Sequence, residues 1–474
     1  MKKILAAILT LLFLIVSLPV SAAPYNSYTF DYWDKAAESP DGYVPVKAVY
    51  GADFGVGALN APEDMNVDKK TGNIYIADTK NNRIICLDGD FNLLKILSEV
   101  NKGGEASPLN TPRGVFFAGD GLLYIADTGN ARIIAVDSGG NVVREMTAPD
   151  SGLLDGLEFK PINMVVDRSQ AVFVLCEGIN QGLLAFDAKG LFSGFYGSNP
   201  VEVTLQLLTD RFWKSIMSRE QQGGMADYVP VEYSGLHIDG EDFIYAASKS
   251  LSVSQLKKMN PKGVNVLPAK RFGDLEIAYV NNSIEDTKFT DICAGEDGTI
   301  NGLDAQRGRV FQYDRECNLL FIFGGIGDQT GTFKAPAAVD SYGDFVYVLD
   351  SAKNSVTLFQ ITRYGQYVKE AVALYNDGYY EEAIEPWREV LKRNANNELA
   401  YSGIGRAQMK LGQYRQAMES LKKGANQTAY SEAFSEYRNE LIRTYFTSAA
   451  VTLAVVIALA VLLFKIRRRK RGKK

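Results

Sequence analysis

The sequence has little of the chemistry that most enzymes use. Its 474 residues include one histidine, His237, and four cysteines, none of them in a CxxC pair. A lone histidine without a GxSxG elbow does not indicate a Ser/His/Asp triad, and the chain has no P-loop, HExxH or dinucleotide-binding glycine motif. We therefore expect His237 to pack within a strand, and expect buried thiols rather than a disulfide framework at Cys86, Cys176, Cys293 and Cys317.

Positive charge is scarce outside the end of the chain. The formal net charge is −5, but eight of the last ten residues are Lys or Arg, so the remainder carries about −13. An acidic exterior argues against nucleic acid as a partner. Hydrophobic residues make up 46% of the chain, which is enough for two or three domains with real cores.

Both ends of the chain carry membrane-targeting patterns. Residues 444–464 contain no charge and precede the basic tail at 465–474, a pattern typical of a transmembrane helix with a cytoplasmic tail. At the start, two lysines, an apolar run and small residues predict a signal peptide over residues 1–23. We therefore expect a single-pass protein of the cell membrane with its N-terminal domains outside the cell.

A repeated unit fills the middle of the chain. The Tyr-Ile-Ala-Asp run ending at Asp78 recurs 49 residues later at Asp127, and an arginine follows each five residues on. The order of strands and turns around each run gives four strands per unit, which predicts a propeller blade. Six blades are counted from the residue that ends each second strand: Asp78, Asp127, Glu177, Ser248, Asp304 and Asp350.

Two segments complete the predicted propeller. The sixth unit lacks a fourth strand, and Val46–Tyr50 has the aromatic ending followed by Gly51 that other fourth strands show, so we expect it to close the ring. The long third-to-fourth connection holds an insertion at 198–231 with helical spacing. We expect Phe212 and Trp213 of this insertion to contact a partner. The aromatic arm at 24–43 is expected to pack against the propeller's side or to bind a sugar or partner surface.

The repeats resemble NHL repeats, which build six-bladed propellers, over about residues 44–362. The resemblance implies an all-β six-bladed propeller. Because a feature that recurs from blade to blade is expected to hold strands together, we assign a structural role to the repeated Asp and Arg: Asp78 with Arg83, Asp127 with Arg132, and Asp304 with Arg309.

After the propeller the hydrophobic period changes from strand to helix. Gly378 and Tyr380 recur 34 residues later as Gly412 and Tyr414, and this offset resembles tetratricopeptide repeats. The resemblance implies an α-helical module at 363–443 that either binds a protein partner or serves as a rigid stalk.

One ring of residues could support chemistry. Asp64, Asn163 and Asp291 occupy the second position after each blade's leading residue, where we expect side chains to face the central channel. Their oxygens suit Ca²⁺ or a similar divalent cation. Gluconolactonase-like propellers use an acidic and Asn-containing channel site, so this resemblance implies metal-dependent lactone hydrolysis as the alternative function. Against it, Arg113 enters the same mouth and no residue stands out as a base.

The sequence thus favours a membrane-anchored extracellular binding or scaffold protein that is not an enzyme and needs no cofactor. Its expected partners are proteins at the membrane, or carbohydrate, with no nucleic acid. By fold-level analogy alone, an ABC-type sugar importer is the kind of envelope complex that such a propeller would support.

Overall fold

The computed structural model describes residues 23–149, 158–197, 232–249, 254–275, 278–280, 283–285 and 287–471. The signal-peptide prediction, apart from residue 23, and the predicted insertion with Phe212 and Trp213 lie outside this part of the chain. The chain forms two compact units, divided between Thr362 and Arg363, except that Phe30–Lys35 belongs with the second unit.

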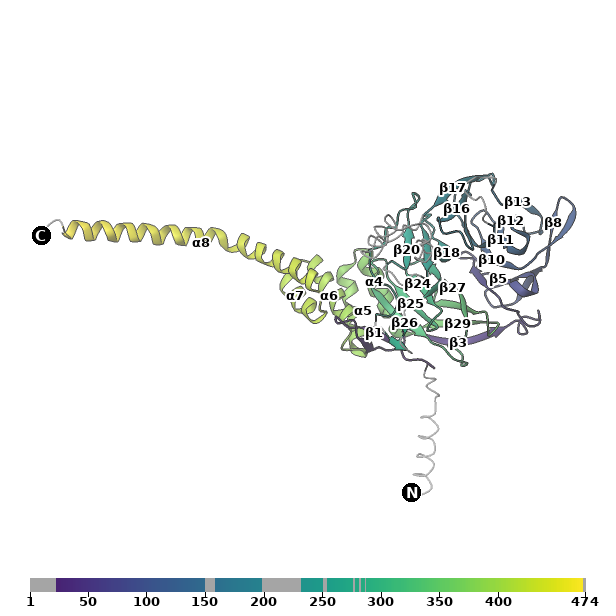
Figure 1. The fold of residues 1–474 in the computed structure, drawn as a ribbon. Helices are drawn as coiled ribbons and strands as arrows, with labels where there is room; N and C mark the ends of the chain where they lie inside the picture. The colour runs from purple at the N-terminus through teal and green to yellow at the C-terminus, as the bar shows by residue number, and fades with distance from the viewer. Residues whose placement is uncertain are drawn as a thin grey trace, which may run out of the picture. The chain divides into compact units, whose positions relative to one another are not determined.

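The first unit is a six-bladed β-propeller, as predicted (Figure 1). Each blade is an antiparallel sheet whose first strand lies innermost, against the first strands of its neighbours. Blades one to three consist of β4 (Asp64–Val67), β5 (Ile74–Asp78), β6 (Arg83–Leu87) and β7 (Leu93–Leu97); β10 (Pro112–Phe117), β11 (Leu123–Asp127), β12 (Arg132–Val136) and β13 (Val142–Thr147); and β14 (Pro161–Val166), β15 (Val172–Cys176), β16 (Leu183–Phe186) and β17 (Phe192–Tyr196). Short 3₁₀ turns, Thr79–Asn81 and Thr128–Asn130, join the second and third strands of blades one and two.

Blade four departs from the predicted count of four strands. The strands of blades four to six are β18 (Tyr233–Ile238), β19 (Ile244–Ser248) and β20 (Leu256–Met259); β23 (Phe289–Ala294), β24 (Ile300–Asp304), β25 (Arg309–Tyr313) and β26 (Leu319–Gly324); and β27 (Pro336–Tyr342), β28 (Phe345–Asp350), β29 (Ser355–Ile361) and β3 (Tyr43–Tyr50). Beside β20 the described chain makes one isolated bridge, between Met259 and Asn265. Further along the chain, the Phe272 N–H donates to the Gln255 side chain at 3.1 Å. The described residues after β20 therefore make single contacts with this blade and no continuous ladder of backbone hydrogen bonds.

The N-terminal segment closes the ring, which confirms the prediction. β3 pairs with β29 from Tyr50 opposite Ser355 to Tyr43 opposite Ile361, and the two strands lie side by side in Figure 1. Val49 of β3 is buried in an apolar cluster that also holds Ile76 of blade one and Leu349 of blade six. Burial of apolar surface between neighbouring blades therefore stabilises the closure.

In the described part of the chain, three small hairpins lie outside the blades. They are β1 (Tyr28–Phe30) with β2 (Ala36–Glu38), β8 (Glu99–Lys102) with β9 (Glu105–Pro108), and β21 (Ala278–Val280) with β22 (Ser283–Glu285). The start of the aromatic arm contacts the propeller, because the Tyr25 hydroxyl donates to the Tyr43 carbonyl and the Tyr28 hydroxyl donates to Asp274. Trp33 of the second unit is 74% exposed.

The second unit is helical. Its described helices are α4 (Arg363–Asn376), α5 (Tyr380–Arg393), α6 (Glu398–Lys410), α7 (Tyr414–Lys423) and α8 (Gln427–Arg471). α4 packs against α5, and α6 against α7. Gly378 and Gly412 follow α4 and α6 with φ of 86° and 74°, a left-handed conformation that glycine adopts without strain and that reverses the chain between paired helices.

α8 is the candidate membrane span. Its 45 residues correspond to a length of about 67 Å at 1.5 Å per residue. Among the described residues it is the one helix long and apolar enough to cross a membrane, and its apolar window has no buried residues.

Candidate ligand site at the mouth of the channel

Two acidic residues of the inner strands bind the backbone of the next blade. The Val115 N–H of blade two donates to Asp64 Oδ2 of blade one at 2.8 Å. The Val339 N–H of blade six donates to Asp291 Oδ2 of blade five at the same distance. In both cases the acceptor lies two residues after the leading residue of its blade, which we call the second position. The donor lies three residues after the leading residue of the next blade, at the third position. These carboxylates therefore hold neighbouring blades together.

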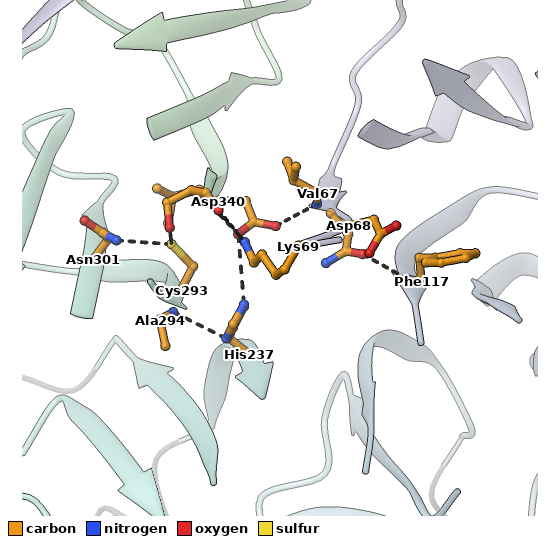
Figure 2. A network of polar contacts seen from close by, with 12 residues as sticks. Val67, Asp68, Lys69, Phe117, His237, Cys293, Ala294, Asn301 and Asp340 are labelled. Carbon is orange, nitrogen blue, oxygen red and sulfur yellow. Dashed lines mark hydrogen bonds and ion pairs between the residues drawn. The ribbon is translucent and has the colours of Figure 1, made fainter. Parts of the chain in front are cut away.

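A second layer of contacts follows the same rule two residues further along each strand (Figure 2). Asn66 accepts from the Phe117 N–H at 2.9 Å, and Asp340 accepts from the Val67 N–H at 2.7 Å. His237 Nδ1 accepts from the Ala294 N–H at 3.3 Å. Inter-blade bonds of this type thus join blades one to two, four to five and six to one.

His237 is a buried strand residue, as the sequence indicates. Burial lowers its pKa to about 4, so the imidazole is neutral at neutral pH. Its Nδ1 accepts a hydrogen bond, which places the proton on Nε2, 4.0 Å from Asp340. Asp340 also pairs with Lys69, whose ammonium donates to the Ser341 carbonyl at 2.5 Å (Figure 2).

A cavity of about 790 Å³ lies where the leading ends of the inner strands meet. Asp64, Asn163 and Asp291, which the sequence places in one ring, all line it. Arg113 lies in its wall, as the sequence also indicates, and its guanidinium contacts Glu63 at 2.5 Å and also Glu177. These three residues come from blades one, two and three, so the wall is fixed by a charged bridge across blades.

Further lining residues come from blade four and its flanks. Glu232 lines the cavity and accepts the Gly178 N–H at 2.8 Å, which holds its carboxylate in place. Lys249 is the second cation of the lining, and its side chain is exposed. Glu177 is one of the residues that count the blades, but the sequence pattern indicates no site role for Glu63, Glu177 or Glu232. What they share is a position just before a first strand or just after a second strand, and this signal emerges once the blades are aligned.

The deepest carboxylates are strongly perturbed. Burial raises the pKa of Asp64 to about 7. Burial, followed by the nearby charge of Asp64, raises the pKa of Asp291 well above its usual range. No Lys or Arg side chain of the described residues forms an ion pair with either. At neutral pH the two groups therefore do not both carry a full negative charge.

Glycine is required where blades approach closely. A Cβ on Gly235 would lie 2.3 Å from Asp291 Oδ1, and a Cβ on Gly114 would lie 2.6 Å from the Ile162 carbonyl oxygen. The two glycines share the second position with Asp64 and Asp291, so this position binds the next blade in blades one and five and makes room for it in blades two and four.

The two carboxylates of the predicted metal set make contacts within the fold. Within the described ranges, no group of three or more His, Cys, Asp or Glu residues could hold a metal ion. The predicted set has two carboxylates and an amide, and each carboxylate already accepts a backbone N–H.

The repeated Asp and Arg residues tie loops to blades. Arg83 Nε contacts Asp78 at 2.7 Å, and Arg132 Nε contacts Asp127 at 2.7 Å. In blade five, however, Arg309 contacts Asp274 at 2.8 Å instead of Asp304, and Asp274 also pairs with Arg307. The Asp304 carboxylate accepts backbone N–H groups. These three aspartates, and Asp350 at the same place in blade six, each accept the backbone N–H of a residue that precedes their blade's first strand: Asn60, Asn110, Lys288 and Lys334.

Comparisons with known proteins find solved structures of low similarity. No protein-family model and no curated protein matches the chain. Among solved structures, virginiamycin B lyase from Staphylococcus aureus is 11% identical with a TM-score of 0.39, over 65% of this chain and 97% of that one. A gluconolactonase from Xanthomonas campestris is 12% identical with a TM-score of 0.37, over 68% and 97%. At values this low the similarities carry no functional argument.

Proposed function

We propose that this chain is a membrane-anchored extracellular binding protein whose propeller holds a protein partner at the cell surface. In this proposal the propeller is of the NHL type, α4–α7 form a tetratricopeptide-like module, and α8 crosses the membrane. We expect the partner to belong to an envelope complex such as an ABC-type sugar importer.

One observation carries the proposal. The cavity at the channel mouth is lined by polar side chains of the inner strands, but the carboxylates best placed for chemistry accept the backbone N–H groups that join blades. A carboxylate that is buried and already hydrogen-bonded is poorly available as a general base, which must lie within reach of the proton it abstracts. Recognition therefore fits this lining better than catalysis does.

Cross-linking in intact membranes tests the proposal. Cells that express the full chain are treated with a membrane-impermeant cross-linker, and the joined proteins are identified by mass spectrometry. Reproducible links from the propeller or α4–α7 to envelope proteins are expected. A profile no different from that of a membrane-anchored control protein would contradict the proposal.

The second candidate function is that of a metal-dependent lactonase. The observation in its favour is that Asp64, Asn163 and Asp291 line the same cavity. Turnover of a sugar lactone that is abolished by a chelator and by Asp291→Ala, but not by Asp90→Ala on an exposed turn, would establish it. Absence of turnover in the presence of Ca²⁺ would remove it.

A further inference from the structure

The charges that line the channel mouth are unequal. Among the described residues of the lining, five carboxyl groups (Glu63, Asp64, Glu177, Glu232 and Asp291) face two cationic side chains. Both cations have limited effect inside the cavity, since Arg113 is shared between two glutamates and Lys249 is exposed.

In the described part of the chain, no cationic side chain pairs with the two carboxyl groups at the floor of this cavity, Asp64 and Asp291. Asp64 and Asp291 are 7% and 6% exposed, and each accepts backbone N–H groups but no side-chain donor among the described residues. Buried carboxyl groups without a positive partner are costly, and a cationic ligand would reduce that cost. An anion such as a phosphate or a sugar acid would increase it.

We propose that the channel-mouth cavity binds an organic cation, an ammonium or guanidinium group, over the Asp64 and Asp291 floor and between Glu177 and Glu232. The proposal rests on the proposed function in taking this cavity as a binding site. The group has two possible sources, a free amine or a Lys or Arg side chain of the protein partner. The recognition is the same, because carboxylates pair with either group through charge-assisted hydrogen bonds.

Titration calorimetry on the full chain in detergent micelles tests the inference. The probes are an acetylated, amidated Lys-Arg-Lys peptide, its neutral analogue built from norleucine and citrulline, and free arginine. Glucose, gluconate and Ca²⁺ complete the set. We expect binding of the basic peptide or of arginine, and none of the neutral analogue. Binding of the basic peptide would indicate a side chain of the protein partner as the source of the cation. Binding of free arginine would indicate a free amine.

The variants locate the binding. Glu177→Gln and Glu232→Gln are each expected to weaken binding about fivefold, the effect of losing one partly exposed charge pair. Gln at 232 still offers an oxygen to the Gly178 N–H. The matched control is Glu105→Gln on β9, an exposed glutamate outside the lining, which should leave affinity unchanged.

A proton readout adds an independent criterion. A cation placed over the floor lowers the pKa of Asp64 and Asp291, so binding at pH 7 should release protons. The release appears as a difference in binding heat between phosphate and Tris buffers. It should shrink in Asp64→Asn, which keeps an oxygen for the Val115 N–H.

Several results would overturn the inference. They are equal binding of the neutral analogue, binding of glucose, gluconate or Ca²⁺ alone, equal weakening by Glu105→Gln, or no binding of any probe. Its failure is distinguishable from failure of the proposed function. Envelope cross-links without cation binding would sink the inference alone, whereas cation binding without cross-links would sink the protein-binding role.

Discussion

At the scale of single residues, the polar side chains of this propeller connect one part of the fold to another. The aspartates that end second strands fasten the loop that leads into the blade, and those of the inner strands fasten the next blade. Aspartate therefore has two structural roles in this fold. The inner-strand aspartates Asp64 and Asp291, which bind the next blade, also line the cavity at the channel mouth.

The buried pair of Asp127 and Arg132 gives a direct stability prediction. Asp127→Ala leaves the guanidinium of Arg132, 7% exposed, without its carboxylate and the Asn110 N–H without its acceptor. We expect the free energy of unfolding to fall by about 3 kcal/mol, as for other broken buried pairs. Urea unfolding of the full chain in detergent measures it. Asp90→Ala, in an exposed turn, is the control, and an equally small effect of both changes would refute the role assigned to Asp127.

His237 predicts a pH dependence. Burial lowers its pKa from 6.5 to about 4. Between these values the unfolded chain binds a proton that the folded chain does not, so this residue reduces stability as the pH falls from 6.5 towards 4, by on the order of 3 kcal/mol. His237→Gln removes the titration and is expected to flatten that part of the stability curve. Unfolding at pH 7, 5.5 and 4.5 measures it, and parallel curves would contradict the prediction.

Residue roles could be predicted from the sequence where they depend on local repetition. Asp78 and Arg83 recur as Asp127 and Arg132, and each arginine contacts its aspartate at 2.7 Å. Partners from other blades were not predictable in this way. Asp64 and Val115 are 51 residues apart, and their contact depends on how two sheets pack rather than on any local pattern.

At the scale of elements, closure of the propeller ring by β3 is the clearest case in which a sequence pattern predicted the structure. The aromatic residue before Gly51 predicted a fourth strand that no neighbouring segment of sequence could complete into a blade. This strand, β3, pairs with the edge of β29 in blade six. The three-stranded blade four shows the limit of such counting. There, side-chain and single backbone contacts around Gln255 replace the ladder that a fourth strand would make.

β3 provides a matched pair of substitutions. Val49 is 8% exposed in the cluster between blades six and one, whereas Val46 on the same strand is 51% exposed. Val49→Asp buries a charge in that cluster, and we expect it to lower the free energy of unfolding by about 3 kcal/mol or more. Val46→Asp should change it by about 0.5 kcal/mol or less. Chemical unfolding compares the two, and similar effects would argue against closure of the ring by this strand.

At the scale of the whole molecule, the candidate membrane span α8 predicts where the protein resides. Its apolar window is exposed within the chain, so another apolar environment is expected to cover it. A chain that ends at Arg443 lacks the uncharged stretch and should partition into the soluble fraction, whereas the full chain should need detergent. Fractionation by ultracentrifugation measures this. A truncated chain that remains in the membrane pellet after carbonate washing would contradict the assigned span.

The central claim is that the channel mouth is the binding face of a surface-anchored protein. Site-specific photo-cross-linking in intact cells tests it most directly, with the photoreactive residue either at Lys249 on the cavity rim or at Glu105 on β9, outside the cavity lining. The account predicts a discrete cross-linked product from position 249 that is absent from position 105. Products from 105 alone, or from neither position, would contradict it.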